Sequence, residues 1–292
     1  MSTIGYYKSC SLHASSKDYS RSLEAVFARL SVKLVTIDDW NCCGASSAHS
    51  ADEVLGLALP ARNLARAEAQ GLTTLLVPCS ACYTRMLQTA ERMRTDERIA
   101  QEINDVIRPS RYLGTVQVKN ILEVLWTEVG LSRILRAATK NLRGMRLACY
   151  YGCYLTRTPR VESFDDRENP QSMERLLRAL GADPVDWPYK TDCCGAAFAI
   201  SEQDLSTTLC DKLFDMARKV GAEALVATCP LCHTNLDLNQ DKLKVEKGRH
   251  YGLPVFYITD LLGIALGCDL GRKQWRSRFI PPQGLLARYA LE

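Results

Sequence analysis

The sequence lacks the features that mark a membrane protein or a nucleic-acid-binding protein. Its 292 residues have a formal net charge of only +4, and no run of lysine and arginine is interleaved with aromatic residues, so we expect no nucleic acid partner. The longest apolar stretches, near "LLVPC" and "VFYITDLLGIALGC", are interrupted and too short to span a bilayer. We therefore expect no membrane span.

The N-terminal stretch "MSTIGYYKSC" has no basic region followed by an apolar core, so we expect no secretory signal. This points to the cytoplasm. The apolar share of 47% and the charged share of 24% are ordinary for a globular protein. A chain of this length suits two domains.

What the chain has in excess is cysteine, with 13 residues. Secreted disulfide scaffolds are usually much shorter and have little core, whereas this chain has enough apolar residues to fold without disulfides. In a reducing compartment, cysteines bind metal or carry out redox chemistry more often than they form structural disulfides. The cysteine pattern is therefore the main guide to function.

Ten of the cysteines form two series with the same order and similar spacings. In each series a single cysteine is followed by an adjacent pair and then by a Cys-x-x-Cys, and the gaps are 31 and 35 residues in the first series and 39 and 34 in the second. The first series is Cys10, Cys42, Cys43, Cys79 and Cys82, and the second is Cys153, Cys193, Cys194, Cys229 and Cys232.

The sequence around these cysteines repeats as well. "GYYKSCS" matches "CYYGCYL", "NCCGA" matches "DCCGA", and "LLVPCSACY" matches "ALVATCPLCH". This indicates an internal duplication whose halves meet near residues 141–147. We expect a first domain at 1–143, a second domain at 144–268 and a C-terminal extension at 269–292.

Strand and helix patterns alternate in each half. We expect strands at 3–9, 32–37 and 73–78, with amphipathic helices between them. A helical stretch at 51–70 contains Pro60, which should kink or divide it, and Asn169 with Pro170 should begin a later helix. The prediction is an α/β fold of two pseudo-symmetric duplicated domains, each a mainly parallel sheet flanked by helices. Each cysteine position follows a predicted strand, so five sulfurs should meet at one edge of each sheet.

The residue types indicate which kinds of site the cysteines could form. A Cys-x-x-Cys at a strand-to-helix turn aims two sulfurs to one side, and the helix N-terminus favours the thiolate. In a turn allowed by Gly44 or Gly195, both members of an adjacent pair can face one polynuclear target such as an iron–sulfur core. Buried core cysteines, a four-ligand structural zinc site and a thioredoxin-like dithiol are the alternatives. The dithiol would leave three cysteines of each half unexplained.

These motifs resemble the duplicated, cysteine-rich CCG domain of the heterodisulfide reductase B subunit family, including the bacterial heterodisulfide-reductase-like complexes. The words that carry the resemblance include "WNCCGASSAHS", "VPCSACY", "ACYYGCYLTR", "DCCGAAF" and "CPLCHTNLD", and it extends from about Tyr6 to Gly267.

The resemblance implies the catalytic iron–sulfur chain of a multi-subunit complex, with the activity of a cytoplasmic disulfide oxidoreductase. Each half would hold a noncubane [4Fe-4S] cluster through its five cysteines, and a small-molecule or protein-bound disulfide would be reduced, or its thiols oxidised, between the two clusters. Electrons would come from a ferredoxin-like [4Fe-4S] subunit of the C type and a flavin-containing subunit of the A type. The alternative is an electron-relay or scaffold CCG subunit with one iron–sulfur cluster and one zinc site.

Other residues are secondary candidates. We expect Cys149, Cys210 and Cys268 to pack as buried thiols. His13, His49 and His233 lie near the motifs and could donate protons, and Arg85, Arg157 and Lys190 could meet an anionic substrate. In the C-terminal extension, Trp275 or Phe279 could anchor a partner chain; a loosely packed tail is the alternative.

Overall fold

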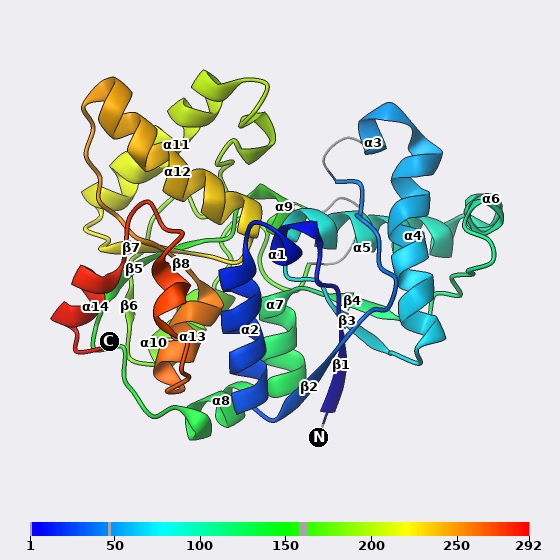
Figure 1. The fold of residues 1–292 in the computed structure, drawn as a ribbon, viewed down its shortest axis with the longest axis horizontal. Helices are drawn as coiled ribbons and strands as arrows, with labels where there is room; N and C mark the ends of the chain where they lie inside the picture. The colour runs from blue at the N-terminus through cyan, green and yellow to red at the C-terminus, as the bar shows by residue number, and fades with distance from the viewer. Residues whose placement is uncertain (1, 46–47, 158–162, 292) are drawn as a thin grey trace.

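The computed structural model describes residues 2–45, 48–157 and 163–291, which form two α/β halves of one design (Figure 1). Each half contains a four-stranded sheet, with strand orders β2-β1-β3-β4 and β6-β5-β7-β8, and every neighbouring pair is parallel. The strands are β1 (Ser2–Tyr6), β2 (Val32–Thr36), β3 (Thr74–Leu76), β4 (Gln117–Lys119), β5 (Arg146–Tyr150), β6 (Asp183–Pro184), β7 (Ala224–Ala227) and β8 (Val255–Tyr257). The identical order confirms the predicted fold class.

Helices connect the strands and cover the sheets. In the first half they are α1 (Cys10–His13), α2 (Lys17–Arg29), α3 (Ala48–Ala51), α4 (Glu53–Ala69), α5 (Ser80–Thr95), α6 (Glu97–Val106), α7 (Ile121–Glu123), a π-helix (Val124–Val129) and α8 (Leu131–Ala137). Later in the chain they are α9 (Cys153–Thr156), α10 (Ser172–Ala179), the 3₁₀ turn Ala196–Phe198, α11 (Gln203–Lys219), α12 (Pro230–Lys247), α13 (Ile258–Ala265), the 3₁₀ turn Arg272–Trp275 and α14 (Gln283–Arg288).

Alternate residues of the central strands face two different layers, as strand geometry requires. In β1, Ile4 and Tyr6 pack into a core shared by both halves, whereas the next residue, Tyr7, packs under α4 and α5. In β5, Cys149 likewise faces the shared core and Tyr150 faces the outer layer. The strands are thus buried on both faces, which is the normal state of parallel sheets.

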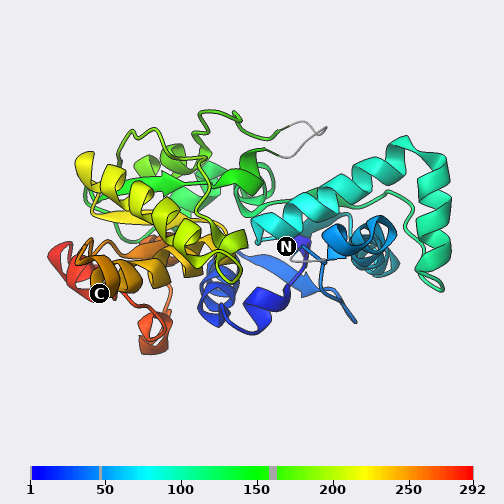
Figure 2. The ribbon, with the colours of Figure 1, turned by 90° about the horizontal axis from the view of Figure 1, so that it is seen from above.

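The two halves meet along α2 and α13, which are in contact and lie next to each other in the ribbon views (Figures 1 and 2). Tyr19 of α2 stacks on Tyr257 with ring centroids 4.1 Å apart, and its hydroxyl donates to the Thr228 carbonyl at 2.8 Å. Ser22 and Thr259 share a buried hydrogen bond of 2.6 Å. Directional contacts of this kind fix how one half lies against the other.

The C-terminal extension folds onto its own chain. Arg278 is buried and contacts Asp18 of α2 at 2.8 Å and Asp260 of α13 at 3.1 Å, so it links the two halves. The expected partner anchor Trp275 instead packs on Phe256, with ring centroids 6.0 Å apart. Phe279 is 52% exposed. The extension is therefore an internal strap rather than a loose tail.

Two predicted helix boundaries were wrong for a physical reason. α4 runs through Pro60 without a break, and the interruption falls at Asp52, whose carboxylate accepts from the Leu55 N–H and caps α4. α10 begins at Ser172, because Asp165, not Asn169, accepts from the first N–H groups at 2.7 and 3.0 Å. Capping side chains decided both boundaries. The predicted strand at 3–9 ends at Tyr6, and the short strands β4 and β8 were not predicted.

We predict that Arg278→Leu lowers the free energy of unfolding by about 3–5 kcal/mol, because the carboxylates of Asp18 and Asp260 lose a buried positive partner. Denaturant unfolding followed by circular dichroism measures this. Arg276→Leu is the matched control, since Arg276 is exposed in the same segment, and it should change stability by less than about 0.5 kcal/mol. Equal effects of the two substitutions would contradict the role of Arg278.

Candidate iron–sulfur site

The ten cysteines of the two series lie at the carboxyl ends of the parallel strands. Cys10 begins α1 after β1, the pair Cys42 and Cys43 follows β2, and Cys79 caps α5 after β3. The second half repeats this arrangement after β5, β6 and β7. We call Cys10, Cys42, Cys43, Cys79 and Cys82 the first set, and Cys153, Cys193, Cys194, Cys229 and Cys232 the second set.

Both cysteine pairs sit in the same turn. Gly44 and Gly195 have φ angles of 72° and 80°, and their N–H groups donate to the first thiol of each pair at 3.4 and 3.3 Å. A Cβ on Gly44 would lie 2.8 Å from the Ala48 Cβ, and one on Gly195 would lie 2.8 Å from the Ser206 Cα. The glycines are thus required both by backbone conformation and by space.

A buried tyrosine hydroxyl donates a hydrogen bond to the backbone of each turn. Tyr7 donates its hydroxyl to the Asn41 carbonyl at 2.7 Å, and Tyr150 donates to the Asp192 carbonyl at 2.6 Å. Each of these carbonyls directly precedes a cysteine pair. Burial raises the pKa of both phenols, so they stay protonated and keep donating. The sequence analysis missed their role, although the repeated Tyr-Tyr in "GYYKSC" and "CYYGC" was a signal for it.

The thiols of the first set contact one another. Cys43 Sγ lies 3.0 Å from Cys82 Sγ. Hydrogen bonds from the Cys42 and Cys82 thiols lower the pKa of Cys43 to about 4, so the fold favours its thiolate, the form that ligates metal. The Cys82 thiol is also hydrogen-bonded to the Cys79 thiol. The hydrogen bond with Cys43 raises the pKa of Cys42, and Cys10 is near enough to raise it further electrostatically.

The second set is arranged in the same way. A hydrogen bond from Cys153 is the main cause that lowers the pKa of Cys193 to about 6. Cys232 is hydrogen-bonded to both Cys194 and Cys229. The two sets also touch, because the Cys79 thiol of one half is hydrogen-bonded to the Cys229 thiol of the other. All ten predicted cysteines are therefore close to at least one other member of their set.

The donor set suits an iron–sulfur core. Iron in such clusters is held by cysteine thiolates, and these sets offer only thiols, most of them buried. Within the described ranges, no group of three or more Cys, His, Asp or Glu side chains is arranged to hold a single metal ion. The structure thus shows two thiol sets, and their role as metal ligands stays a prediction.

The three remaining cysteines have other surroundings. Cys149 is fully buried in the shared core, and Cys210 is fully buried with its thiol 3.2 Å from the Cys194 carbonyl. Cys268 is partly buried, and its thiol lies 3.7 Å from the Ala25 carbonyl. Packing explains all three, and Cys210 also supports the second cysteine pair.

Two of the secondary candidates already have partners within the protein. Lys190 forms a buried ion pair with Glu174 at 2.9 Å. His233 stacks on Tyr257, and its ring nitrogens contact the Val255 carbonyl at 2.7 Å and Arg278 at 3.0 Å. Burial lowers the pKa of His233 well below its usual value, so this ring is held neutral and is not a proton donor to thiolates. His13 and Arg157 are exposed.

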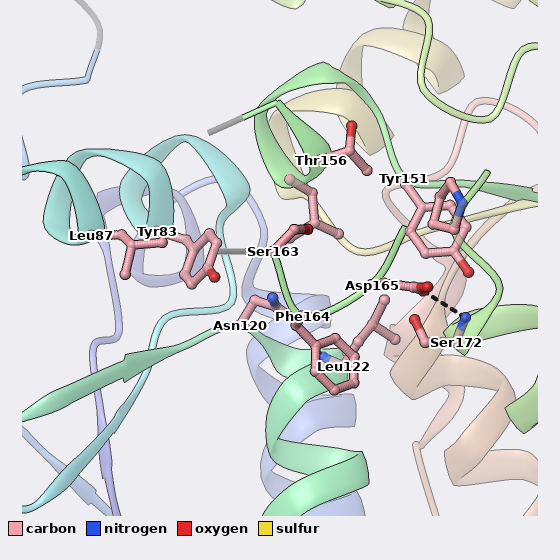
Figure 3. Close-up of a pocket in the computed structure, with 12 residues that line it drawn as sticks. Tyr83, Leu87, Asn120, Leu122, Tyr151, Thr156, Ser163, Phe164, Asp165 and Ser172 are labelled. Carbon is pink, nitrogen blue, oxygen red and sulfur yellow. Dashed lines mark hydrogen bonds between the residues drawn. The ribbon is translucent and has the colours of Figure 1, made fainter. Parts of the chain in front are cut away.

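A small cavity lies between the two halves, lined by residues of both (Figure 3). Its volume is about 20 Å³, enough for a water molecule but not for a disulfide substrate. Asp165 accepts from the Ser172 N–H at 2.7 Å at one side of it, and the loop in which Asp165 lies thereby forms part of the wall. Other lining residues include Tyr83, Leu87, Asn120, Tyr151, Thr156 and Phe164.

Comparison with known proteins identifies the family. The model of the CCG cysteine-rich domain matches residues 4–87 and 147–237, one match in each half. The chain belongs to the CCG cysteine-rich domain family. The resemblance drawn from the motifs is thereby confirmed, including the duplication.

Relatives of this CCG protein match it over nearly its whole length. In Wolinella succinogenes, the membrane anchor subunit of 8-methylmenaquinol:fumarate reductase is 31% identical over 90% of this chain and 92% of its own. In Methanosarcina acetivorans, the B subunit of a ferredoxin/F(420)H(2)-dependent CoB-CoM heterodisulfide reductase is 27% identical over 91% of this chain and 90% of its own. In the described part of the CCG protein, no helix is long and apolar enough to cross a membrane.

A solved structure supports the fold alone. A hypothetical protein from Helicobacter pylori superposes with a TM-score of 0.75 at 13% identity, covering 96% of this chain and 52% of its own. The chain thus spans about half the length of that structure.

We predict that Gly195→Ala destabilises the CCG protein by at least about 1–2 kcal/mol, because alanine pays a steric penalty at this positive φ and meets the Ser206 backbone. Thermal unfolding of anaerobically purified protein measures it. Gly284→Ala in α14, where an added Cβ meets nothing within 4 Å, should change stability by less than about 1 kcal/mol. If Gly195→Ala is as harmless as this control, the turn is not constrained as described.

Proposed function

We propose that the protein is the catalytic iron–sulfur subunit of a heterodisulfide-reductase-like complex. It would carry out two-electron disulfide reduction, or the reverse thiol or sulfur oxidation, on a small-molecule or protein-bound substrate. The observation that supports this best is the approach of the two thiol sets, which touch through Cys79 and Cys229. The similarity to heterodisulfide reductase subunits over about nine-tenths of the chain supports it independently.

The ten cysteines of the two sets would hold two noncubane [4Fe-4S] clusters, one in each half. When bound, such clusters supply single electrons, so two of them beside one sulfur–sulfur bond match a two-electron reaction.

Groups of the chain itself favour anionic ligands around the two thiol sets. Cys79 and Cys229 stand at the N-termini of α5 and α12, where the helix N–H groups favour an anionic ligand. Hydrogen bonds with the Cys232 and Cys79 thiols lower the pKa of Cys229 well below its usual value, whereas the hydrogen bond with Cys229 raises the pKa of Cys79. Tyr7 and Tyr150 keep the two cysteine pairs oriented, and the outer layers of α4, α5, α11 and α12 cover the buried cysteines of both sets, whereas Cys10 and Cys42 are exposed. These groups bind, orient and shield.

Partners would deliver the electrons. We propose a ferredoxin-like [4Fe-4S] subunit of the C type and a flavin-containing subunit of the A type. The names of several relatives, which include ferredoxin-dependent heterodisulfide reductases, support an iron–sulfur electron donor. The cytoplasmic location and the boundaries at 143 and 268 stay predictions.

A second candidate is an electron-relay or scaffold CCG subunit with one iron–sulfur cluster and one zinc site. The 31% identical relative favours it, because that protein is named as part of a fumarate reductase. Metal analysis after anaerobic purification separates the two candidates. About eight irons per chain with negligible zinc supports the first function, and about four irons with one zinc supports the second.

We predict that Cys43→Ser and Cys194→Ser each reduce the iron content by about half and abolish two-electron turnover, because each removes a ligand from one half only. Iron and sulfide counts with electron paramagnetic resonance measure the loss. Cys268→Ser is the matched control, since this thiol lies outside both sets, and it should retain all iron. Disulfide turnover at the parent rate in either pair variant would show that the pair does not serve a catalytic cluster.

A further inference from the structure

A groove opens between α3, α4 and α5 of the first half. Its volume is about 470 Å³, and most of the residues that line it carry a polar or charged group: His49, Glu53, Gly56, Leu57, Arg85, Gln88, Glu91, Arg92 and Thr95. Arg85 lies three residues after Cys82 on α5, about 4.5 Å further along the helix axis. We call it the Arg85 groove.

Two polar atoms in this groove are buried and have no hydrogen-bond partner among the described residues. They are Nε of Arg85 and Nδ1 of His49. A buried donor without a partner costs about 1–3 kcal/mol, and more when it is charged, so native proteins rarely keep one without a purpose. Two such atoms among the residues that line one groove indicate that a ligand completes their hydrogen bonds.

The charges of the groove favour an anion. Its two carboxylates already have arginine partners: Glu53 contacts Arg92 at 3.4 Å and Glu91 contacts Arg94 at 2.7 Å. Of the two arginines that line the groove, Arg85 is therefore the one with no ion pair among the described residues. A guanidinium binds carboxylates and similar planar anions well, because its N–H groups form a fixed fork.

The second half shows what a purely structural residue does at the equivalent position. Asn235 lies three residues after Cys232, as Arg85 does after Cys82. Its side chain donates to the Cys194 carbonyl at 2.8 Å and contacts Ser206 at 3.1 Å, so its bonds stay within the protein. The first half departs from this pattern at Arg85, and the departure coincides with the groove.

Close helix packing keeps His49 at the groove. A Cβ on Gly56 of α4 would lie 2.9 Å from the Cα of His49, so only glycine allows α3 to approach α4 this closely. The ring of His49 is thus held on the wall opposite α5 by the fold rather than by a hydrogen bond at Nδ1.

We propose that the Arg85 groove binds a small organic anion whose carboxylate is held by Arg85 and His49, and that this anion is the acid end of a thiol substrate. The first part depends only on the groove. The second part rests on the proposed function, because the sulfur of the same molecule would have to reach the first thiol set, whose Cys82 lies three residues before Arg85 on α5.

The test compares four probes by calorimetry on the full, anaerobically purified protein. They are 3-mercaptopropionate, the neutral 3-mercapto-1-propanol, and their sulfur-free counterparts propionate and 1-propanol. We expect each acid to bind at least about tenfold more tightly than its alcohol, since a hydrogen bond to a charged group is worth about that factor. We also expect 3-mercaptopropionate to bind more tightly than propionate.

Variants assign the preference to the groove. Arg85→Gln should remove the preference for the acids and leave the alcohols unchanged. Gln88→Glu should do the same without removing any native contact, because it places a carboxylate one turn from Arg85. Arg98→Gln in α6 is the control, and it should keep the full preference, since Arg98 is exposed and does not line the groove.

The outcomes separate this inference from the proposed function. Equal binding of acids and alcohols in protein with its full iron would overturn the groove and leave the proposed function standing. An Arg85-dependent preference in protein that binds no iron would support the groove and overturn the proposed function. If 3-mercaptopropionate binds no more tightly than propionate, the second part of the proposal is wrong.

Discussion

The structure depends on one constraint: ten thiols, several of them favoured as thiolates, are held together in a mostly buried region. Thiolates repel one another, and without a positive partner their burial is costly. The chain meets this constraint with donors aimed at sulfur and at the adjoining backbone, namely the N–H groups of Gly44 and Gly195, the thiols of neighbouring cysteines and the N-termini of α5 and α12. A cationic inorganic core would supply the remaining positive charge.

Duplication turns one such arrangement into two that face each other. The parallel order of the strands places every motif of a half at one sheet edge, and the shared core between the sheets fixes the two edges together. Arg278 and the stacked rings of Tyr19 and Tyr257 reinforce this contact beside Cys229. The C-terminal strap therefore acts on the geometry between the two sets, although it lies outside both matched domains.

The repeated organisation could be predicted well from the sequence, because local signals determine it. Cysteine spacing, strand periodicity and the glycine after each cysteine pair need no knowledge of distant contacts. The start of α10 depends on Asp165, six residues before the helix's N-cap Gln171, and the inward packing of Trp275 depends on β8, so neither could be read from the local sequence. Likewise, the sequence left Lys190 as a candidate contact for an anionic substrate and His233 as a candidate proton donor. In the fold both side chains have partners within the protein, Glu174 for Lys190 and Arg278 for His233.

The most direct test of the account is a crystal structure of the protein grown without oxygen, with diffraction collected at the iron absorption edge. The account predicts two separate iron peaks, one surrounded by Cys10, Cys42, Cys43, Cys79 and Cys82 and the other by Cys153, Cys193, Cys194, Cys229 and Cys232. Iron in neither half, or disulfides joining these sulfurs to one another, would contradict it.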